Sequence, residues 1–168
     1  MSLKTPSNLL ISLLTYSTVF LSSLFHPTDP ALGWYIKYGE YFFKNHQILR
    51  ENIFSSQMTD FRWVNHSWGT DLISYLVFNN FGFLGLSILA ALVITFTFYL
   101  FSKSARLDNF EKALIFPIIL YFLSPINAVS FRGQLLSLMF LGLLSYILKH
   151  HLRTKSKIIY AVPFVLAL

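Results

Sequence analysis

The sequence predicts an all-α protein: a polytopic membrane helical bundle with interfacial amphipathic helices in its first external loop. The first observation is composition, because 55% of the 168 residues are hydrophobic and 12% are charged, whereas a soluble domain carries about 25% charged residues. The second is that uncharged apolar runs of nearly the length that crosses a bilayer recur along the chain. The third is that the charges gather between these runs. Together they predict an integral, multi-pass membrane protein.

Five apolar runs are the predicted spans of a single membrane domain over residues 1–168: residues 9–25, 81–101, 113–126, 131–148 and 158–168. The first run is longer than the apolar region of a signal peptide, and no A-x-A site follows it, which favours an uncleaved span over a signal peptide. Residues 113–148 would reach about 54 Å as a helix, close to two crossings, so they predict a hairpin. The last run reaches only about 16 Å, and we therefore expect the chain to be truncated.

The long segment between the first two spans, residues 26–71, has an amphipathic beginning. Apolar and aromatic residues recur on one face of residues 30–45, and charged residues fall on the other. Glu40 and Lys44 are spaced i,i+4 in the order that favours an ion pair. A short helix of this kind lies in the membrane interface, so we expect an interfacial helix over residues 30–45.

A second amphipathic piece, residues 68–79, comes directly before the span at 81–101. Gly82 and Gly85 stand near the start of that span. Small residues allow helices to approach closely in a membrane, so we expect a neighbouring helix to pack against these glycines.

The net charge of +6 orients the chain and does not indicate nucleic-acid binding. Basic residues flank the predicted hairpin, and short loops rich in Lys and Arg stay in the cytoplasm. Residues 26–71 instead hold four basic and five acidic residues. We therefore expect a cytoplasmic N-terminus, an extracytoplasmic loop over residues 26–71, contact with membrane lipids and no nucleic-acid partner. The chain has no cysteine, which excludes disulfides and thiolate metal sites.

Two charged residues are of special interest because the predicted topology brings them to the same side of the membrane. Asp29, followed by Pro30, is suited to cap the interfacial helix, and it is equally a candidate general base or metal ligand. Arg132 is costly in an apolar stretch. It either extends to the interface from a helix end or binds an anion, since a guanidinium matches phosphate oxygens in bidentate fashion. Gln134 could complete such an anion site.

Further candidate substrate-binding residues lie in the external loop: Trp34, Glu40, His66, Trp68 and Asp71. His66 has no second histidine at ligand spacing, so the sequence identifies no metal site. The tryptophans are either interfacial anchors or surfaces on which a sugar ring stacks.

The order of three segments, DPALGWYIKYGEYFFKNHQILRENIFS, WVNHSWGTDLISYLVFNNFGFLGL and SFRGQLLSLMFL, resembles the N-terminal part of bacterial GT-C membrane glycosyltransferases. That broad group is akin to the dolichyl-phosphate-mannose–protein mannosyltransferases. The resemblance implies a protein of the bacterial inner membrane that takes a sugar from a polyprenyl-phosphate donor and transfers it to an extracytoplasmic acceptor.

The resemblance also implies roles for individual residues. Asp29 would accept the proton of the acceptor hydroxyl as general base, and Arg132 would stabilise the leaving phosphate. Trp34 would lie where the polyprenyl head group arrives. A divalent cation beside Arg132 is compatible with this chemistry, but no cofactor is identified.

Three positions depart from the pattern of the group. Ala31 stands where its members often carry an acidic residue, Gly69 where they tend to carry Leu, and Gly133 where many carry Pro. Ala31 favours an alternative, a non-catalytic membrane scaffold. A lipid-linked-sugar transporter is the other alternative, but it would need polar groups near the middle of its spans, and the apolar runs here carry almost none.

Overall fold

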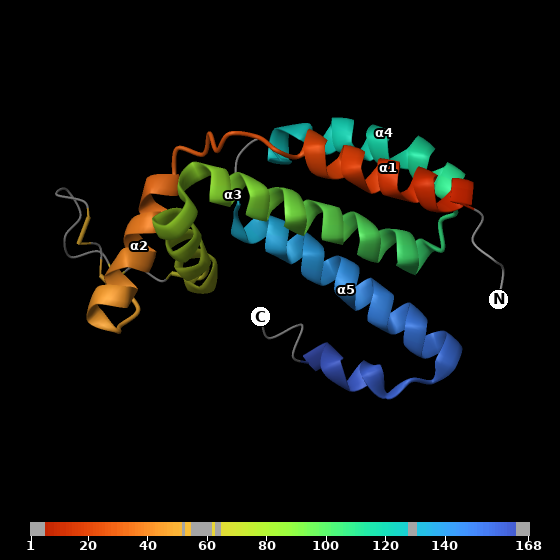
Figure 1. The fold of residues 1–168 in the computed structure, drawn as a ribbon. Coiled ribbons are helices and arrows are strands. Elements are labelled where there is room, and N and C mark those ends of the chain that lie inside the picture. The colour runs from red at the N-terminus through yellow and green to blue at the C-terminus, as the bar shows by residue number, and fades with distance from the viewer. Residues whose placement is uncertain (1–5, 52, 55–61, 63–64, 128–130, 164–168) are drawn as a thin grey trace.

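The computed structural model describes residues 6–51, 53–54, 62, 65–127 and 131–163 of the chain. Its elements, shown in Figure 1, are α1 (Pro6–Ser22), α2 (Leu32–Asn45), α3 (Trp68–Ala105), α4 (Asn109–Asn127), α5 (Gly133–Thr154) and the short 3₁₀ helix η1 (Lys157–Ala161). Among the described residues, extended pairing is limited to one isolated antiparallel bridge between Glu51 and Arg62. The predicted all-α class is confirmed.

α3 is the central helix of the fold, and it contacts α1, α2, α4 and α5. Figure 1 shows α1 and α4 side by side on one flank of α3, α5 along another flank, and α2 at one end. The buried core lies among α1, α3, α4 and the start of α5, and it consists of Val19, Ala90, Val93, Ile94, Phe98, Phe116, Phe131 and Leu135. Truncating these buried apolar side chains would lower the free energy of unfolding, because it would leave cavities between the helices.

α3 bends sharply at Gly82, where the backbone has φ 61° and ψ −154°. The bend divides the helix into a first arm, residues 68–81, and a second arm, residues 83–105 (Figure 1). Glycine reaches this conformation because it has no Cβ. The expectation that Gly82 admits a close neighbour is wrong, since a Cβ at this position would meet nothing within 4 Å. The glycine instead makes the kink that turns the first arm toward α2.

α2 begins two residues after the start of the predicted interfacial helix, residues 30–45, and ends at Asn45 as predicted. It lies against the first arm of α3. At Gly39 a Cβ would overlap the backbone carbonyl of Asp71 and the Cβ of Tyr75. The two helices therefore meet backbone to backbone at the turn of α3 that carries Asp71.

Two helices, α3 and α5, are long and apolar enough to cross a membrane. The predicted span at residues 9–25 corresponds to α1, an apolar helix of 17 residues. The predicted span at 113–126 falls within α4, and the one at 131–148 begins two residues before α5. The last predicted span begins at the 3₁₀ helix η1, while residues 164–168 lie outside the described part.

Candidate functional site

Asp29 lies in the segment between α1 and α2, where it shapes the approach to α2. Its Oδ1 accepts a hydrogen bond from the N–H of Ala31 at 2.9 Å, and its carbonyl oxygen accepts one from the N–H of Leu32 at 3.1 Å. An aspartate side chain that binds the backbone two residues onward forms an Asx turn, which stabilises such starts. The Asp29 side chain is only 2% exposed, so the carboxylate needs a partner inside the protein.

Arg132 supplies that partner from the start of α5. It occupies the N-cap position with extended backbone, φ −138° and ψ 163°, and its Nε lies 2.9 Å from Oδ2 of Asp29. The contact is an ion pair by distance. Neither Nε nor Oδ2, however, has an aligned hydrogen bond with any described residue. The Arg132 side chain as a whole is 30% exposed, although its Nε is buried, and its Nη atoms carry further N–H donors for an anion.

Tyr35 joins this ion pair to the neighbouring cavity. It lies in the first turn of α2, and its hydroxyl accepts a hydrogen bond of 3.2 Å from an Nη atom of Arg132. Its side chain also lines a cavity. The ion pair and the cavity are therefore parts of one site at the junction of α2, the first arm of α3 and α5.

The cavity has a volume of about 250 Å³ and a lining rich in hydrogen-bonding groups. Its lining residues are Tyr35, Ser67, Thr70, Asp71, Gly133 and Gln134. Thr70 and Asp71 are buried, whereas Gln134 is exposed at the rim. The first arm of α3 and the first turn of α5 thus each contribute polar groups to the same hollow.

Asp71 is the most deeply buried titratable group of the site, with 1% of its surface exposed. Its Oδ2 accepts a hydrogen bond of 2.6 Å from Nδ2 of Asn65. Its Oδ1 has no hydrogen-bond partner among the described residues. Burial raises the pKa of Asp71 to about 6, against the opposing effect of the Asn65 hydrogen bond. A carboxyl shifted in this way toward neutrality is typical of groups that exchange protons or bind ligands.

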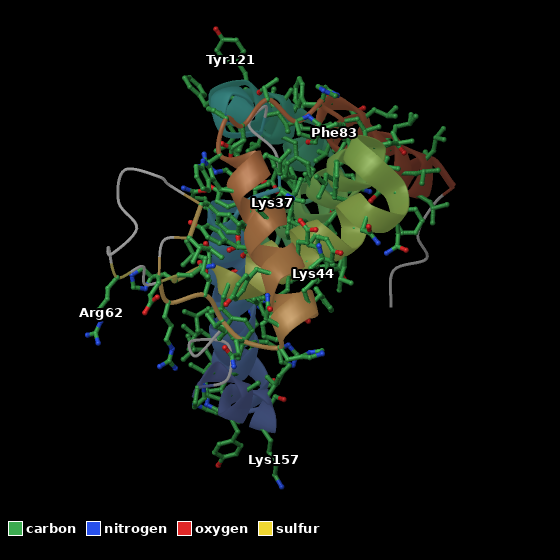
Figure 2. The ribbon with its side chains drawn as sticks, turned by 90° about the vertical axis from the view of Figure 1, so that its left-hand side faces the viewer. Lys37, Lys44, Arg62, Phe83, Tyr121 and Lys157 are labelled. Carbon is green, nitrogen blue, oxygen red and sulfur yellow. The ribbon has the colours of Figure 1, made fainter. Side chains whose placement is uncertain are left out.

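Glu40 and Trp34 lie outside this junction. Glu40 forms ion pairs with Lys37 at 2.7 Å and Lys44 at 2.6 Å, which confirms the i,i+4 pair predicted with Lys44. Hydrogen bonds from the two lysines lower the pKa of the Glu40 carboxyl to about 2. Figure 2 looks onto α2 and shows Lys37 and Lys44 along its outer face. Trp34 is also exposed and contacts the rings of Tyr38 and Phe54.

Trp68 and His66 are not among the residues that line the cavity beside Asp71. Trp68 lines a second, larger hollow of about 480 Å³ together with Arg50, Glu51 and Arg62, and Asn65 also borders it. His66 is exposed in the turn before α3. Of the predicted site residues, the structure brings together Asp29, Arg132, Asp71 and Gln134. The other four, Trp34, Glu40, His66 and Trp68, belong neither to the ion pair nor to the lining of the cavity.

The site combines an accessible cation, a carboxylate held next to it and a cavity of neutral polar groups with one further carboxyl. Across the residues that the structure describes, no three His, Asp or Glu side chains gather in a way that could hold a metal ion. The guanidinium is suited to an anion such as a phosphate. The cavity is suited to a ligand that both donates and accepts hydrogen bonds.

Sequence reasoning missed Tyr35 and Asn65, and it also did not single out Ser67 and Thr70 of the cavity lining. Tyr35 was assigned to the apolar face of the interfacial helix, although its hydroxyl contacts Arg132. Asn65 stands in the WVNHSW segment, six residues before Asp71. An amide so close to an acidic residue of a helix start is a signal for a side-chain hydrogen bond, and it could have indicated this pair.

No protein-family model, curated protein or solved structure matches this chain.

Proposed function

We propose that the chain belongs to a membrane glycosyltransferase that transfers a sugar from a polyprenyl-phosphate donor to an extracytoplasmic acceptor. The observation that carries this proposal is the contact between Asp29 and Arg132 beside the polar cavity. Such a transfer needs a cation to bind the phosphate, a carboxylate close to that cation, and nearby groups that bind hydroxyls.

The proposal includes a multi-pass arrangement in the bacterial inner membrane. Its support is that α3 and α5 are long and apolar enough to cross, and that large apolar side chains stand exposed on the remaining helices as well. Leu9 and Leu13 of α1 and Phe122 of α4 are all more than half exposed, and Figure 2 shows Tyr121 projecting from α4. Extensive exposed apolar surface marks contact with a membrane or a partner.

In the proposed reaction the donor phosphate first binds the guanidinium of Arg132. Its oxygens compete with Oδ2 of Asp29 for this cation, so donor binding releases the Asp29 carboxylate. Asp29 then takes the proton of the acceptor hydroxyl as that oxygen attacks the anomeric carbon. The bond from the anomeric carbon to the phosphate oxygen breaks, and the polyprenyl phosphate leaves with its new negative charge facing Arg132. A single displacement inverts the anomeric carbon.

The test uses the purified chain in lipid nanodiscs, supplied with polyprenyl phosphate carrying mannose, glucose or galactose and with a membrane extract as the source of acceptors. Binding of the donor and formation of polyprenyl phosphate are both measured. We expect Asp29→Asn to bind donor but to lower polyprenyl phosphate formation by about 10²–10⁴-fold, the usual share of a general base. Arg132→Lys keeps a positive charge beside Asp29 but loses the bidentate guanidinium, and it should weaken binding of the donor and of bare polyprenyl phosphate alike.

Asp108→Asn is the matched control, because it makes the same chemical change between the end of α3 and the start of α4, away from the site at the beginning of α3. Asp108 is exposed and forms a reciprocal cap with Glu111 at the start of α4, and asparagine is an equally good cap residue. Full turnover by Asp29→Asn would refute the base assignment. Binding of donor by the wild-type chain without turnover would select the scaffold instead, and movement of the donor across the bilayer would select the transporter.

A further inference from the structure

The proposed reaction leaves Asp71 without a role, although one oxygen of this buried carboxyl has no hydrogen bond among the described residues. It is 1% exposed, it receives one hydrogen bond from Asn65, and its Oδ1 has no partner among the described residues. Leaving a buried acceptor of this kind unpaired costs free energy of folding. Asp71 lines the cavity between α2, α3 and α5, and its Oδ1 lies beneath the cavity surface. A ligand hydroxyl supplies the missing donor once the carboxylate rotates toward the cavity.

The surroundings of the cavity decide which donor fits. Arg132 directly precedes Gly133 and Gln134 of the lining, but its charge is already paired with Asp29. The other lining groups are neutral: the hydroxyls of Tyr35, Ser67 and Thr70 and the amide of Gln134. Hydroxyls and amides both donate and accept hydrogen bonds, which is also the property of a sugar hydroxyl.

The size of the cavity sets a second limit. Its volume of about 250 Å³ lies just below the roughly 300–1,000 Å³ of pockets that enclose a drug-sized ligand. The cavity is therefore large enough for a group of about the size of one sugar ring. Tyr35 contacts both Arg132 and the cavity, so a ring in the cavity is directly next to a phosphate on the guanidinium.

We propose that this cavity binds the sugar ring of the donor and that Asp71 takes a hydrogen bond from one ring hydroxyl. Gln134 contacts the ring from the rim. The identity of the ligand as a lipid-linked sugar rests on the proposed function, whereas the assignment of the cavity as a hydroxyl-binding subsite rests on Asp71 and its neighbours.

The experiment compares the affinity of the chain in nanodiscs for bare polyprenyl phosphate with its affinity for the same lipid carrying mannose, glucose or galactose. We expect the wild-type chain to bind at least one sugar-bearing lipid about 10-fold or more tightly than the bare lipid, the usual worth of a hydrogen bond to a charged group. Asp71→Asn should bring this ratio close to one, and Gln134→Ala should reduce it in part. Asp108→Asn should retain it.

Binding of the bare lipid separates the two proposals. If the wild-type chain does not bind bare polyprenyl phosphate, the phosphate site at Arg132 and the proposed function fail together with this inference. If it binds the bare lipid but gains nothing from any of the three sugars, or if both Asp71→Asn and Gln134→Ala retain the full gain, the inference alone is overturned. Should Asp71→Asn lose binding of the bare lipid as well, the ratio measured for Gln134→Ala decides.

Discussion

Asp29 and Arg132 form a contact whose two halves are unequally protected. The Asp29 side chain is 2% exposed, and the Arg132 side chain is 30% exposed. Removing the arginine would leave a carboxylate inside the protein without a counter-charge, which is strongly destabilising. Removing the carboxylate leaves a guanidinium that can still reach water. The ion pair therefore stabilises the charge of Asp29 more than that of Arg132. The arginine is the partner that a competing anion can bind.

The sequence predicted part of this site for reasons of topology. Asp29 follows the first apolar run, and Arg132 lies close to the turn of the predicted hairpin. Counting spans was therefore sufficient to bring the two residues together, and the structure shows them in contact. Glu40 was predicted on the same basis, but its charge is engaged by Lys37 and Lys44 on the outer face of α2. Periodicity within α2 could not tell which polar residue would face α5.

The sequence could not predict the burial of Asp71, because this burial depends on three parts of the chain at once. α2 lies against it at Gly39, Asn65 binds one of its oxygens, and the start of α5 borders the same cavity. These are long-range packing relations, which propensity and periodicity do not contain. Asp71 was predicted as a polar loop residue that binds substrate, and its burial is a finding of the structure.

The titration of Asp71 gives a prediction about stability. Its pKa rises from the ordinary 3.8 to about 6 on folding, because of burial. Well below pH 4 the carboxyl is protonated in both the folded and the unfolded state. Between about pH 4 and pH 6 the unfolded chain has released this proton but the folded chain still holds it, so the free energy of unfolding falls as pH rises. Asp71→Asn does not titrate. We therefore expect the Tm of this variant, relative to wild type, to rise between about pH 4 and pH 7.

Thermal unfolding in detergent at several pH values measures this difference. A Tm difference between Asp71→Asn and the wild-type chain that stays constant over the range would contradict the raised pKa. A Tm difference that grows as pH falls would mean that folding lowers the pKa of Asp71 instead of raising it.

At the scale of elements, the kink of α3 is the feature that positions the site. The sequence predicted an amphipathic piece at residues 68–79 and a separate span at 81–101, and the structure joins them in one helix that bends between them at Gly82. The change from amphipathic to uniformly apolar residues marked the place. It did not reveal the backbone conformation, because apolar periodicity does not report φ and ψ.

Substitution of the kink residue tests its importance. Gly82→Ala places a Cβ on a backbone with φ 61° and ψ −154°, a conformation that costs other residues about 1–3 kcal/mol. The backbone can avoid this cost by straightening, which would move the first arm away from α2. We expect a lower Tm and weaker binding of bare polyprenyl phosphate, both measured in detergent or nanodiscs.

Gly69→Ala is the control, because it lies in the first turn of the same helix and a Cβ there would also meet nothing within 4 Å. It should retain or slightly raise the Tm, since alanine favours a helix over glycine. Equal effects of the two substitutions would show that the positive φ of Gly82 is not what matters.

At the scale of the whole molecule, the predicted apolar runs at residues 9–25, 81–101, 113–126 and 131–148 each fall largely on a helix of the structure. The predicted runs at 81–101 and 131–148 correspond to α3 and α5, the two helices that are long and apolar enough to cross a membrane. The arrangement around α3 was not predictable in the same way, because apolar runs of similar composition can pack in many orders. The contacts of α3 with four other helices are set by matching side chains, not by hydropathy.

Orientation in the membrane is a prediction that the chain is well suited to test, because it contains no cysteine. Lys37→Cys introduces a thiol on the exposed outer face of α2, and Lys155→Cys introduces one just after α5. In intact bacterial cells a membrane-impermeant maleimide should label the first variant. The second should react only after permeabilisation, since basic loops stay in the cytoplasm.

The wild-type chain should remain unlabelled in both conditions and serves as the background control. Labelling of both thiols in intact cells would place α2 and the end of α5 on the same side of the membrane. That result would contradict the proposed topology and the extracytoplasmic position of Asp29.

The long separation in sequence between Asp29 and Arg132 has a consequence for biosynthesis. A ribosome makes the carboxylate first, and it completes α2, α3 and α4 before the arginine that neutralises this charge exists. During that interval Asp29 has to remain hydrated or protonated, because a bare buried carboxylate is too costly. The polar junction can therefore close only after the beginning of α5 has left the ribosome.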